Sequence, residues 1–270
     1  MPTLPERIGI DFGARLPIEQ ALDWAQHNGV RYLDVRLGDT GNEFAGFDAT
    51  RIAAVRAALE RTGLHLGLHT LSAVNMAETA PYLTEAVDAY LRAYIDLAGP
   101  LGAGWIVVHA GYHFTDDYQR RMEAGLQRLQ RLGDYAAAKG VRLLLENMNP
   151  EPRDAEVRYL ASDVEECRAS FARLDPEHIG WSFTVNHAHM LPVGIAGFFN
   201  AFGPARMAEV RVADNRGGKE EHLKPGEGNI DFPAMFRLIE GSGYRGHYML
   251  AFGTLDDMRG GRDLLARMAA

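Results

Sequence analysis

The stretch VRLLLENMNP, at residues 141–150, is an apolar run that stops abruptly at Glu146 and Asn147. A short, continuous aliphatic run followed by turn residues is typical of a strand that is buried on both faces of a parallel sheet. In α/β barrels, polar residues at the C-terminal ends of such strands form the active site. We therefore interpret residues 141–146 as a barrel strand and Glu146 as a candidate catalytic residue.

Apolar runs alternate with amphipathic segments of helical period along the whole chain. The expected strands cover residues 7–12, 31–37, 64–69, 105–109, 141–146, 179–184, 208–213 and 247–251. The expected helices cover residues 18–27, 49–61, 81–97, 118–138, 163–174, 193–202, 232–240 and 255–268. Eight consecutive βα units predict an α/β fold, a single (β/α)8 TIM barrel domain over residues 1–270. A doubly wound open sheet is the alternative, but no glycine-rich phosphate fingerprint follows the first strand.

Composition narrows the classes of partner and compartment. The 270 residues carry a formal net charge of −8 and no basic run, which argues against nucleic acid or an anionic membrane as a partner. The N-terminus lacks a signal-peptide pattern, and no apolar run reaches the ~18 residues that cross a bilayer. The single cysteine, Cys167, excludes an intramolecular disulfide and suits a reducing compartment. We expect a cytoplasmic protein, and composition leaves its oligomeric state open.

Polar side chains stand at or near the ends of most expected strands. Two of them, His69 and His109, end the third and fourth strands, so that they meet the end of the strand that carries Glu146. Two histidines at matching strand ends beside a carboxylate favour a shared site. Further candidates are Asp11, Asp34 or Arg36, Thr184, His187, Arg211, Asp214, Glu220 and His222, with Tyr112 and Trp181 as apolar platforms for a ring.

Six segments resemble the xylose isomerase-like TIM barrel superfamily. They read LGLHTLSAVNMA, IVVHAGYH, LLLENMNP, IGWSFTVNHAHM, VRVADN and HLKPGEGNIDF. The superfamily includes sugar and sugar-phosphate isomerases and epimerases, together with the endonuclease IV group (AP endonuclease family 2). The resemblance runs from the first strand to the eighth, and it implies a barrel that binds a small carbohydrate-like ligand.

The resemblance also implies one divalent metal, held by Glu, Asp, His and Glu at the ends of strands five to eight. Glu146 matches the first ligand, but Thr184, Arg211 and Ala251 stand at the other three positions. An arginine keeps its proton at physiological pH and does not bind a metal. We therefore expect no metal at this usual position and predict no other cofactor.

Arg211 lies within the expected strand sequence VRVAD, where an unpaired guanidinium would be costly. Its expected ion-pair partner is Glu146, two strands away round the barrel. Two interpretations of this pair remain open. It is either a structural ion pair that fills a lost metal site, or a guanidinium that replaces the metal's charge and stabilises an enediolate-like anion.

The endonuclease IV relatives imply two further metal positions. The first matches His69, His109 and Glu146, and zinc there is the alternative to a site without metal. The second matches His187, Glu220 (in place of an aspartate) and His222. DNA repair itself is disfavoured, because phosphate binding needs a positive charge that the chain lacks.

The favoured function is isomerisation, epimerisation or a related lyase step on a small sugar-like polyhydroxy carbonyl compound. Proton transfer next to a carbonyl needs a positioned base and a group that stabilises the oxyanion. We assign the base to Glu146, the electrophilic role to Arg211, and the protonation or orientation of oxygens to His69 and His109. The expected substrate-binding residues are His187, Asp214, His222, Tyr112 and Trp181. The alternative is a non-catalytic relative that binds a sugar-like ligand or a partner protein.

Overall fold

Eight parallel strands close into a barrel in the computed structural model, which describes residues 2–39 and 41–269. Their order round the barrel is β1-β10-β9-β8-β6-β4-β3-β2, so each strand pairs with the next barrel strand along the chain. Their bounds are β1 Ile8–Gly13, β2 Tyr32–Val35, β3 His65–His69, β4 Trp105–Val108, β6 Arg142–Glu146, β8 Ile179–Thr184, β9 Met207–Val212 and β10 His247–Leu250. The predicted (β/α)8 barrel is confirmed, because every expected strand forms within two residues of its expected bounds.

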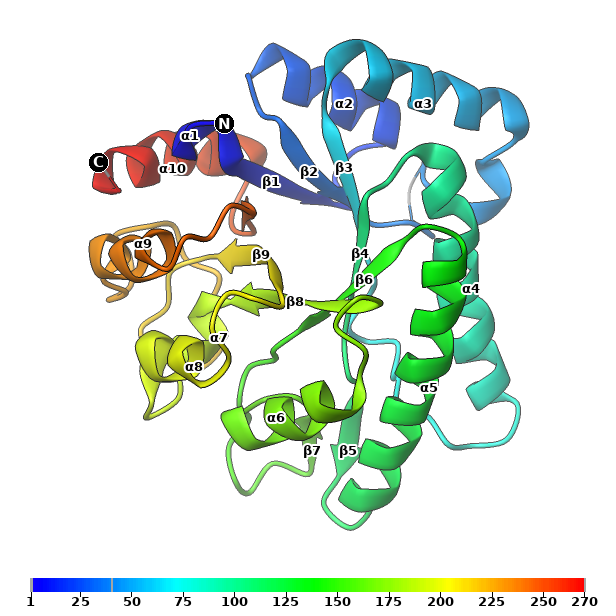
Figure 1. Cartoon of the computed structure of the whole chain (residues 1–270), viewed down its shortest axis with the longest axis vertical. Coiled ribbons are helices and arrows are strands. Elements are labelled where there is room, and N and C mark those ends of the chain that lie inside the picture. Colours follow the sequence, from blue (N-terminus) through cyan, green and yellow to red (C-terminus); the bar gives the residue numbers. More distant parts are fainter. Residues whose placement is uncertain (1, 40, 270) are drawn as a thin grey trace.

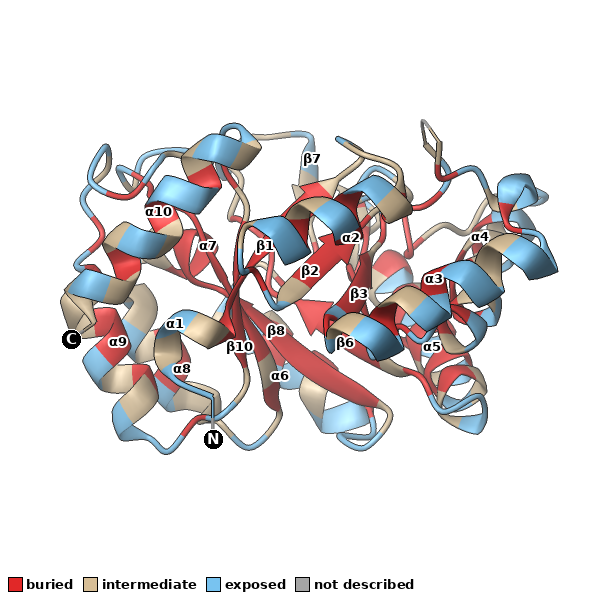
Figure 2. Ribbon diagram, turned by 90° about the horizontal axis from the view of Figure 1, so that it is seen from above, coloured by how far each residue is buried: buried red, intermediate tan, exposed pale blue. Residues whose placement is uncertain are grey.

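A long helix lies between successive barrel strands and after the last one, outside the barrel (Figure 1). These helices are α2 Ile18–His27, α3 Ala49–Thr62, α4 Leu83–Leu101, α5 Tyr118–Ala138, α6 Val164–Arg173, α8 Gly194–Phe202, α9 Phe232–Gly241 and α10 Leu255–Met268. Figure 2 shows strands that are buried along most of their length and helices that expose their outer sides. The apolar core therefore lies between the sheet and the helices. No helix of the described residues is long and apolar enough to cross a bilayer.

Local chemistry sets where α3 begins and ends. Asp48 precedes the helix, and its carboxylate accepts the backbone N–H of Arg51 at 2.8 Å. This bond satisfies one of the N–H groups that a helix leaves unpaired at its start. Gly63 ends the helix with φ of 67°, a left-handed conformation that glycine adopts without strain.

Several short elements lie in the loops between the predicted ones. They are α1 Leu4–Arg7, the 3-10 turn η1 Phe44–Gly46, α7 Val185–His189, and the strands β5 Tyr112–Phe114 and β7 Val157–Tyr159. The last two pair antiparallel in a small sheet apart from the barrel. Helix α7 starts directly after β8 and carries His187. These elements are too short to produce a hydrophobic period that sequence inspection could detect.

The barrel interior carries buried charges where aliphatic side chains are usual. Asp34, Glu209 and Arg211 are at most 2% exposed. Gly67 on β3 makes room for this arrangement, because a Cβ there would lie 2.3 Å from the Asp34 carboxylate and 2.1 Å from the Trp105 ring. The Trp105 indole N–H donates to Asp34 at 3.0 Å. A layer of buried polar side chains therefore lies inside the barrel, beneath its mouth.

Candidate active site

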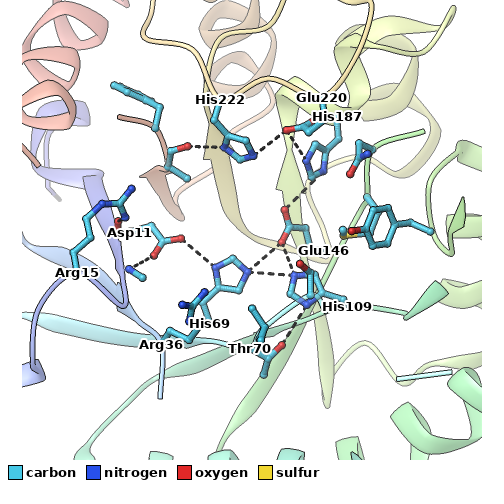
Figure 3. A pocket seen from close by; sticks show the side chains of 18 of the residues that line it. Asp11, Arg15, Arg36, His69, Thr70, His109, Glu146, His187, Glu220 and His222 are labelled. Atoms are coloured by element: carbon cyan, nitrogen blue, oxygen red, sulfur yellow. Dashed lines mark hydrogen bonds and ion pairs between the residues drawn. The ribbon is translucent and has the colours of Figure 1, made fainter. Parts of the chain in front are cut away.

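A cavity of ≈440 Å³ opens at the C-terminal ends of the barrel strands. This volume falls in the range of roughly 300–1,000 Å³ that is common for small-molecule sites. Its polar side chains converge from strand ends and from the loops that follow them (Figure 3). They include Asp11, Arg15, Arg36, His69, Thr70, His109, Glu146, His187, Glu220 and His222.

Glu146 ends β6 and is buried at the centre of this group. Its Oε2 lies 3.4 Å from the Nε2 of His69 and 3.3 Å from the Nε2 of His109. Its Oε1 accepts the hydroxyl of Thr184 at 2.6 Å. Burial raises the pKa of Glu146, but hydrogen bonds from His109 and His69 and the positive charge of Arg211 hold that pKa well below its usual value. Glu146 is therefore an ionised carboxylate at neutral pH.

The two histidines beside Glu146 differ in their protonation. The Nδ1 of His69 donates to Asp11 at 3.1 Å, and its Nε2 lies 3.3 Å from the Nε2 of His109. Burial lowers the pKa of His69, but its bonds to Asp11 and Glu146 raise it to about 9. Burial lowers the pKa of His109, whose Nδ1 contacts the Thr70 hydroxyl at 3.3 Å. At neutral pH, His69 therefore carries a proton on each ring nitrogen, whereas His109 is neutral and carries a proton on one of them.

A second cluster surrounds Glu220, in the loop after β9. Its Oε1 lies 3.3 Å from the Nε2 of His187 and 2.9 Å from the Nε2 of His222. The Nδ1 atoms of these histidines donate to the carbonyl oxygens of Asn147 and Ala251, each at 2.7 Å. Burial raises the pKa of Glu220, and the bonds from His187 and His222 outweigh it and lower the pKa to about 2.

Both clusters have the donor set of a metal site. The ligand atoms of His69, His109 and Glu146 lie within 4.8 Å of one another, and so do those of His187, Glu220 and His222. Each of the four histidines has its Nδ1 held by an oxygen and its Nε2 turned toward the shared carboxylate. Two imidazoles and a carboxylate with anchored rings are suitable for zinc. These residues therefore fit a divalent ion.

The position at which the resemblance implies a single metal does not have such a donor set. The Thr184 hydroxyl donates its proton to Glu146. Ala251 contributes no ligand atom from its side chain, and Arg211 contributes a permanent positive charge. One carboxylate remains from four ligand positions, so these residues do not fit a divalent ion.

The predicted ion pair between Glu146 and Arg211 is wrong. The Nη1 of Arg211 donates to Asp34 at 2.6 Å and to Glu209 at 3.0 Å, and its Nη2 donates to Asp11. Among the described residues, no salt bridge of 4.0 Å or less joins Arg211 to Glu146. Three carboxylates, on β1, β2 and β9, bind the guanidinium, whereas Glu146 is held by histidines and Thr184. Arg211 lies beneath the cavity and does not line it.

Three of the predicted substrate-binding residues are also absent from the cavity lining. The carboxylate of Asp214 accepts the backbone N–H groups of Asn215, Gly226, Gly228 and Ile230, and so it organises the loop after β9. Trp181 is fully buried, and its indole N–H donates to the side chain of Asn147. Tyr112 packs edge-on against Tyr159, and Tyr159 is the residue that lines the cavity.

The structure gives partners to Asp11, which was already a candidate, and adds Thr70, Glu209 and Arg15 to the predicted set. Asp11 joins Arg211 to His69, and Thr70 contacts His109. Glu209 is a further partner of Arg211 and lies two positions before it on β9. Residues two apart in a strand share one face, so the spacing of Glu209 and Arg211 was a usable signal. Arg15 and Arg36 line the cavity from the loops after β1 and β2.

Comparison with known proteins agrees with the fold. The family model of the xylose isomerase-like TIM barrel matches residues 22–267. An L-ribulose 3-epimerase from Methylomonas sp. (strain DH-1) is 25% identical over 236 residues, covering 84% of this chain and 75% of the relative. A crystal structure of a D-tagatose 3-epimerase-like protein superimposes with a TM-score of 0.84 at 20% identity, covering 97% of this chain and 96% of the other. A crystal structure of a 3-keto-D-glucoside 4-epimerase from E. coli superimposes with a TM-score of 0.75 at 19% identity, covering 97% of this chain and 98% of the other. The chain belongs to the xylose isomerase-like TIM barrel family.

Proposed function

We propose that this protein is an isomerase or epimerase that acts on small sugar-like polyhydroxy carbonyl compounds by proton transfer. The observation that carries the proposal is the buried, ionised carboxylate of Glu146 between the Nε2 atoms of His69 and His109 in the cavity. The names of the relatives support the substrate class, because they describe an L-ribulose 3-epimerase, a D-tagatose 3-epimerase-like protein and a 3-keto-D-glucoside 4-epimerase.

The proposed chemistry begins with a proton on the carbon next to the substrate carbonyl. Glu146 removes that proton, which leaves negative charge on the carbonyl oxygen. His69 and His109 lie beside Glu146 and bind this oxygen, so they stabilise the charge where it develops. Delivery of a proton to the opposite face of the same carbon gives the epimer. Delivery to the neighbouring carbon, with a proton moved from one oxygen to the other, gives the isomer.

Arg211 is not part of this proposed chemistry, because it lies beneath the cavity and its guanidinium is bound by three carboxylates. His187 and His222 line the opposite part of the cavity and bind substrate hydroxyls. A divalent ion held by His69, His109 and Glu146 would supply a Lewis acid that polarises the carbonyl. The proposal places no metal at the family's usual position.

Exchange with solvent deuterium tests the proposal directly. Purified protein is incubated in D₂O with a panel of ketoses and aldoses, and NMR measures deuterium next to the carbonyl. We expect exchange into at least one substrate, with a loss of about 10²–10⁴-fold in Glu146→Gln, which keeps the shape and removes the base. Glu60→Gln, an exposed change on α3, is the matched control. Full exchange by the Glu146→Gln protein would show that another group is the base.

The second candidate is a non-catalytic sugar-binding relative. It is favoured by the loss of three of the four ligand positions of the usual metal site, at Thr184, Arg211 and Ala251. Binding of a panel sugar without any deuterium exchange, with and without added zinc, would support this candidate instead.

A further inference from the structure

Two arginines line the same side of the cavity, and the proposed function gives neither a role. Arg15 follows β1 and Arg36 follows β2. Figure 3 shows them on either side of Asp11, across the cavity from Glu220 and His187. They are the arginine side chains in the cavity lining, since Arg211 lies below it.

The local backbone holds the two arginines near each other. Strands β1 and β2 pair in parallel, and Gly13 at the end of β1 is the partner of Val35. Gly13 has φ of 53°, a left-handed turn that directs the chain toward Arg15. Its carbonyl accepts the backbone N–H of Arg36 at 2.9 Å. The two side chains therefore start from neighbouring points on one rim.

The charge of Arg15 has no anionic partner in the described residues. Its Nη1 donates to the carbonyl oxygens of Asp11 and Phe12, each at 3.3 Å, and its Nη2 donates to the carbonyl of Gly253 at 3.0 Å. No carboxylate within residues 2–39 and 41–269 lies within 4.0 Å of its guanidinium. The carbonyl groups orient the guanidinium without neutralising it.

Arg36 is partly neutralised and keeps its terminal groups available. Its Nε donates to Asp39 at 2.5 Å, and in the described part of the chain that is its side-chain hydrogen bond. The side chain is 32% exposed. Its Nη1 and Nη2 can therefore donate to a ligand in the cavity without breaking the contact with Asp39.

The other charged residues of the cavity lining show what kind of ligand the two arginines would bind. Asp11, Glu146 and Glu220 line it, and the pKa of each is lowered by its histidine or arginine contacts, although burial opposes the shift. These carboxylates repel an anion, and apart from the protonated His69 the two arginines are the cationic side chains of the lining that can attract one. Guanidinium groups bind carboxylates and phosphates through paired N–H donors. Arg15 is exposed, so a neutral sugar bound there would displace water from its guanidinium without supplying a counterion.

We propose that the substrate carries an anionic group, a carboxylate or a phosphate, that binds to Arg15 and Arg36 while the reacting carbon faces Glu146. The inference rests on the proposed function for the position of the reacting carbon. The substrate class is then an acidic or phosphorylated polyhydroxy carbonyl compound, and the arginine pair selects it against neutral sugars of the same skeleton.

Three probes that share one carbon skeleton test the inference. They are D-fructose, D-fructose 6-phosphate and D-fructuronate, which differ only in a hydroxyl, a phosphate or a carboxylate at the sixth carbon. Calorimetry measures their dissociation constants at fixed ionic strength with the Glu146→Gln protein, in which turnover does not complicate binding. We expect at least one anionic probe to bind tenfold or more tightly than D-fructose, and the two anions together distinguish phosphate from carboxylate recognition.

Substitutions of the two arginines test whether the preference for anionic probes depends on this site. Arg15→Met and Arg36→Met, each in the Glu146→Gln background, should reduce the ratio of anion affinity to D-fructose affinity about tenfold. Arg61→Met, an exposed change at the opposite end of the barrel, is the control and should keep the preference. Circular dichroism confirms that each variant is folded.

Two results would overturn the inference. One is that neither anionic probe binds more tightly than D-fructose, including the case in which none binds. The other is an anion preference that survives in Arg15→Met and Arg36→Met. Deuterium exchange by the unmodified protein reports separately on the proposed function, so an anion preference without exchange would support the binding site and count against the enzyme.

Discussion

Removal of the Arg211 guanidinium should destabilise the barrel, and the loss should depend on pH. Arg211→Met keeps much of the side-chain volume but leaves Asp11, Asp34 and Glu209 buried without their cation. Removing one partner from a buried ion pair costs roughly 3–5 kcal/mol, because the remaining charge has lost its hydration. We expect a loss of about that size in the free energy of unfolding at pH 8.

The sign of the pH dependence follows from the carboxylates. Without Arg211 their folded pKa values rise above those of the unfolded chain, so the folded variant binds more protons. Its stability therefore improves as pH falls, by up to ~1.4 kcal/mol per pH unit for each extra proton bound. Burial and the charge of Glu209 already raise the pKa of Asp34 to about 8 despite Arg211. We expect the difference from the unmodified protein to shrink to roughly 1–2 kcal/mol at pH 5.

Urea unfolding followed by circular dichroism at pH 5 and pH 8 measures both the loss in the free energy of unfolding and its dependence on pH. Arg211→Lys is the informative second variant, since it keeps the charge but loses the planar fork, and it should lose less stability than Arg211→Met. Arg61→Met, an exposed arginine on α3, should change stability by no more than about 0.5 kcal/mol. A loss below about 1 kcal/mol at pH 8, or an equal loss at both pH values, would refute the reasoning.

Three further predictions concern the positioning of His69, its proton and the start of α3. Asp11→Asn should lower kcat about 10–100-fold on a substrate found by deuterium exchange, because Asp11 orients the His69 ring; an unchanged kcat would remove Asp11 from that role. After chelator treatment, kcat/KM should fall as pH rises through about 9, where His69 loses its proton. Zinc bound to His69 should abolish this fall at high pH. If the pH profiles of kcat/KM with and without zinc are identical, zinc binds elsewhere. Asp48→Ala should cost about 1 kcal/mol in urea unfolding through loss of the helix cap, and Asp48→Asn much less; equal costs would assign the effect to charge.

The strands and the first histidine cluster were predictable because both depend on short-range or topological rules. Strands buried on both faces leave continuous aliphatic runs such as LLL before Glu146. The C-terminal ends of parallel strands meet at one end of a barrel, so His69, His109 and Glu146 had to lie close together. Their contacts of 3.3–3.4 Å agree with that expectation.

The small sheet of β5 and β7 was not predictable for a different reason. Each strand has three residues, and they pair across two separate loops, after β4 and after β6. No period can be measured over three residues. This pairing affects the site, because it sets Tyr112 beside Tyr159, and of these two tyrosines Tyr159 lines the cavity.

The error over Arg211 shows which argument was missing. The predicted partner was chosen by counting strands round the barrel, which says nothing about how many carboxylates compete for one guanidinium. An arginine offers five N–H donors, and a buried one is satisfied best by several acceptors. Asp11 and Asp34 at two strand ends, and Glu209 on the same face of β9, supply those acceptors. Glu146 is meanwhile satisfied by two histidines and a hydroxyl. Matching every buried charge to a partner, rather than one pair at a time, would have separated the structural cation below the cavity from the proposed base in its lining.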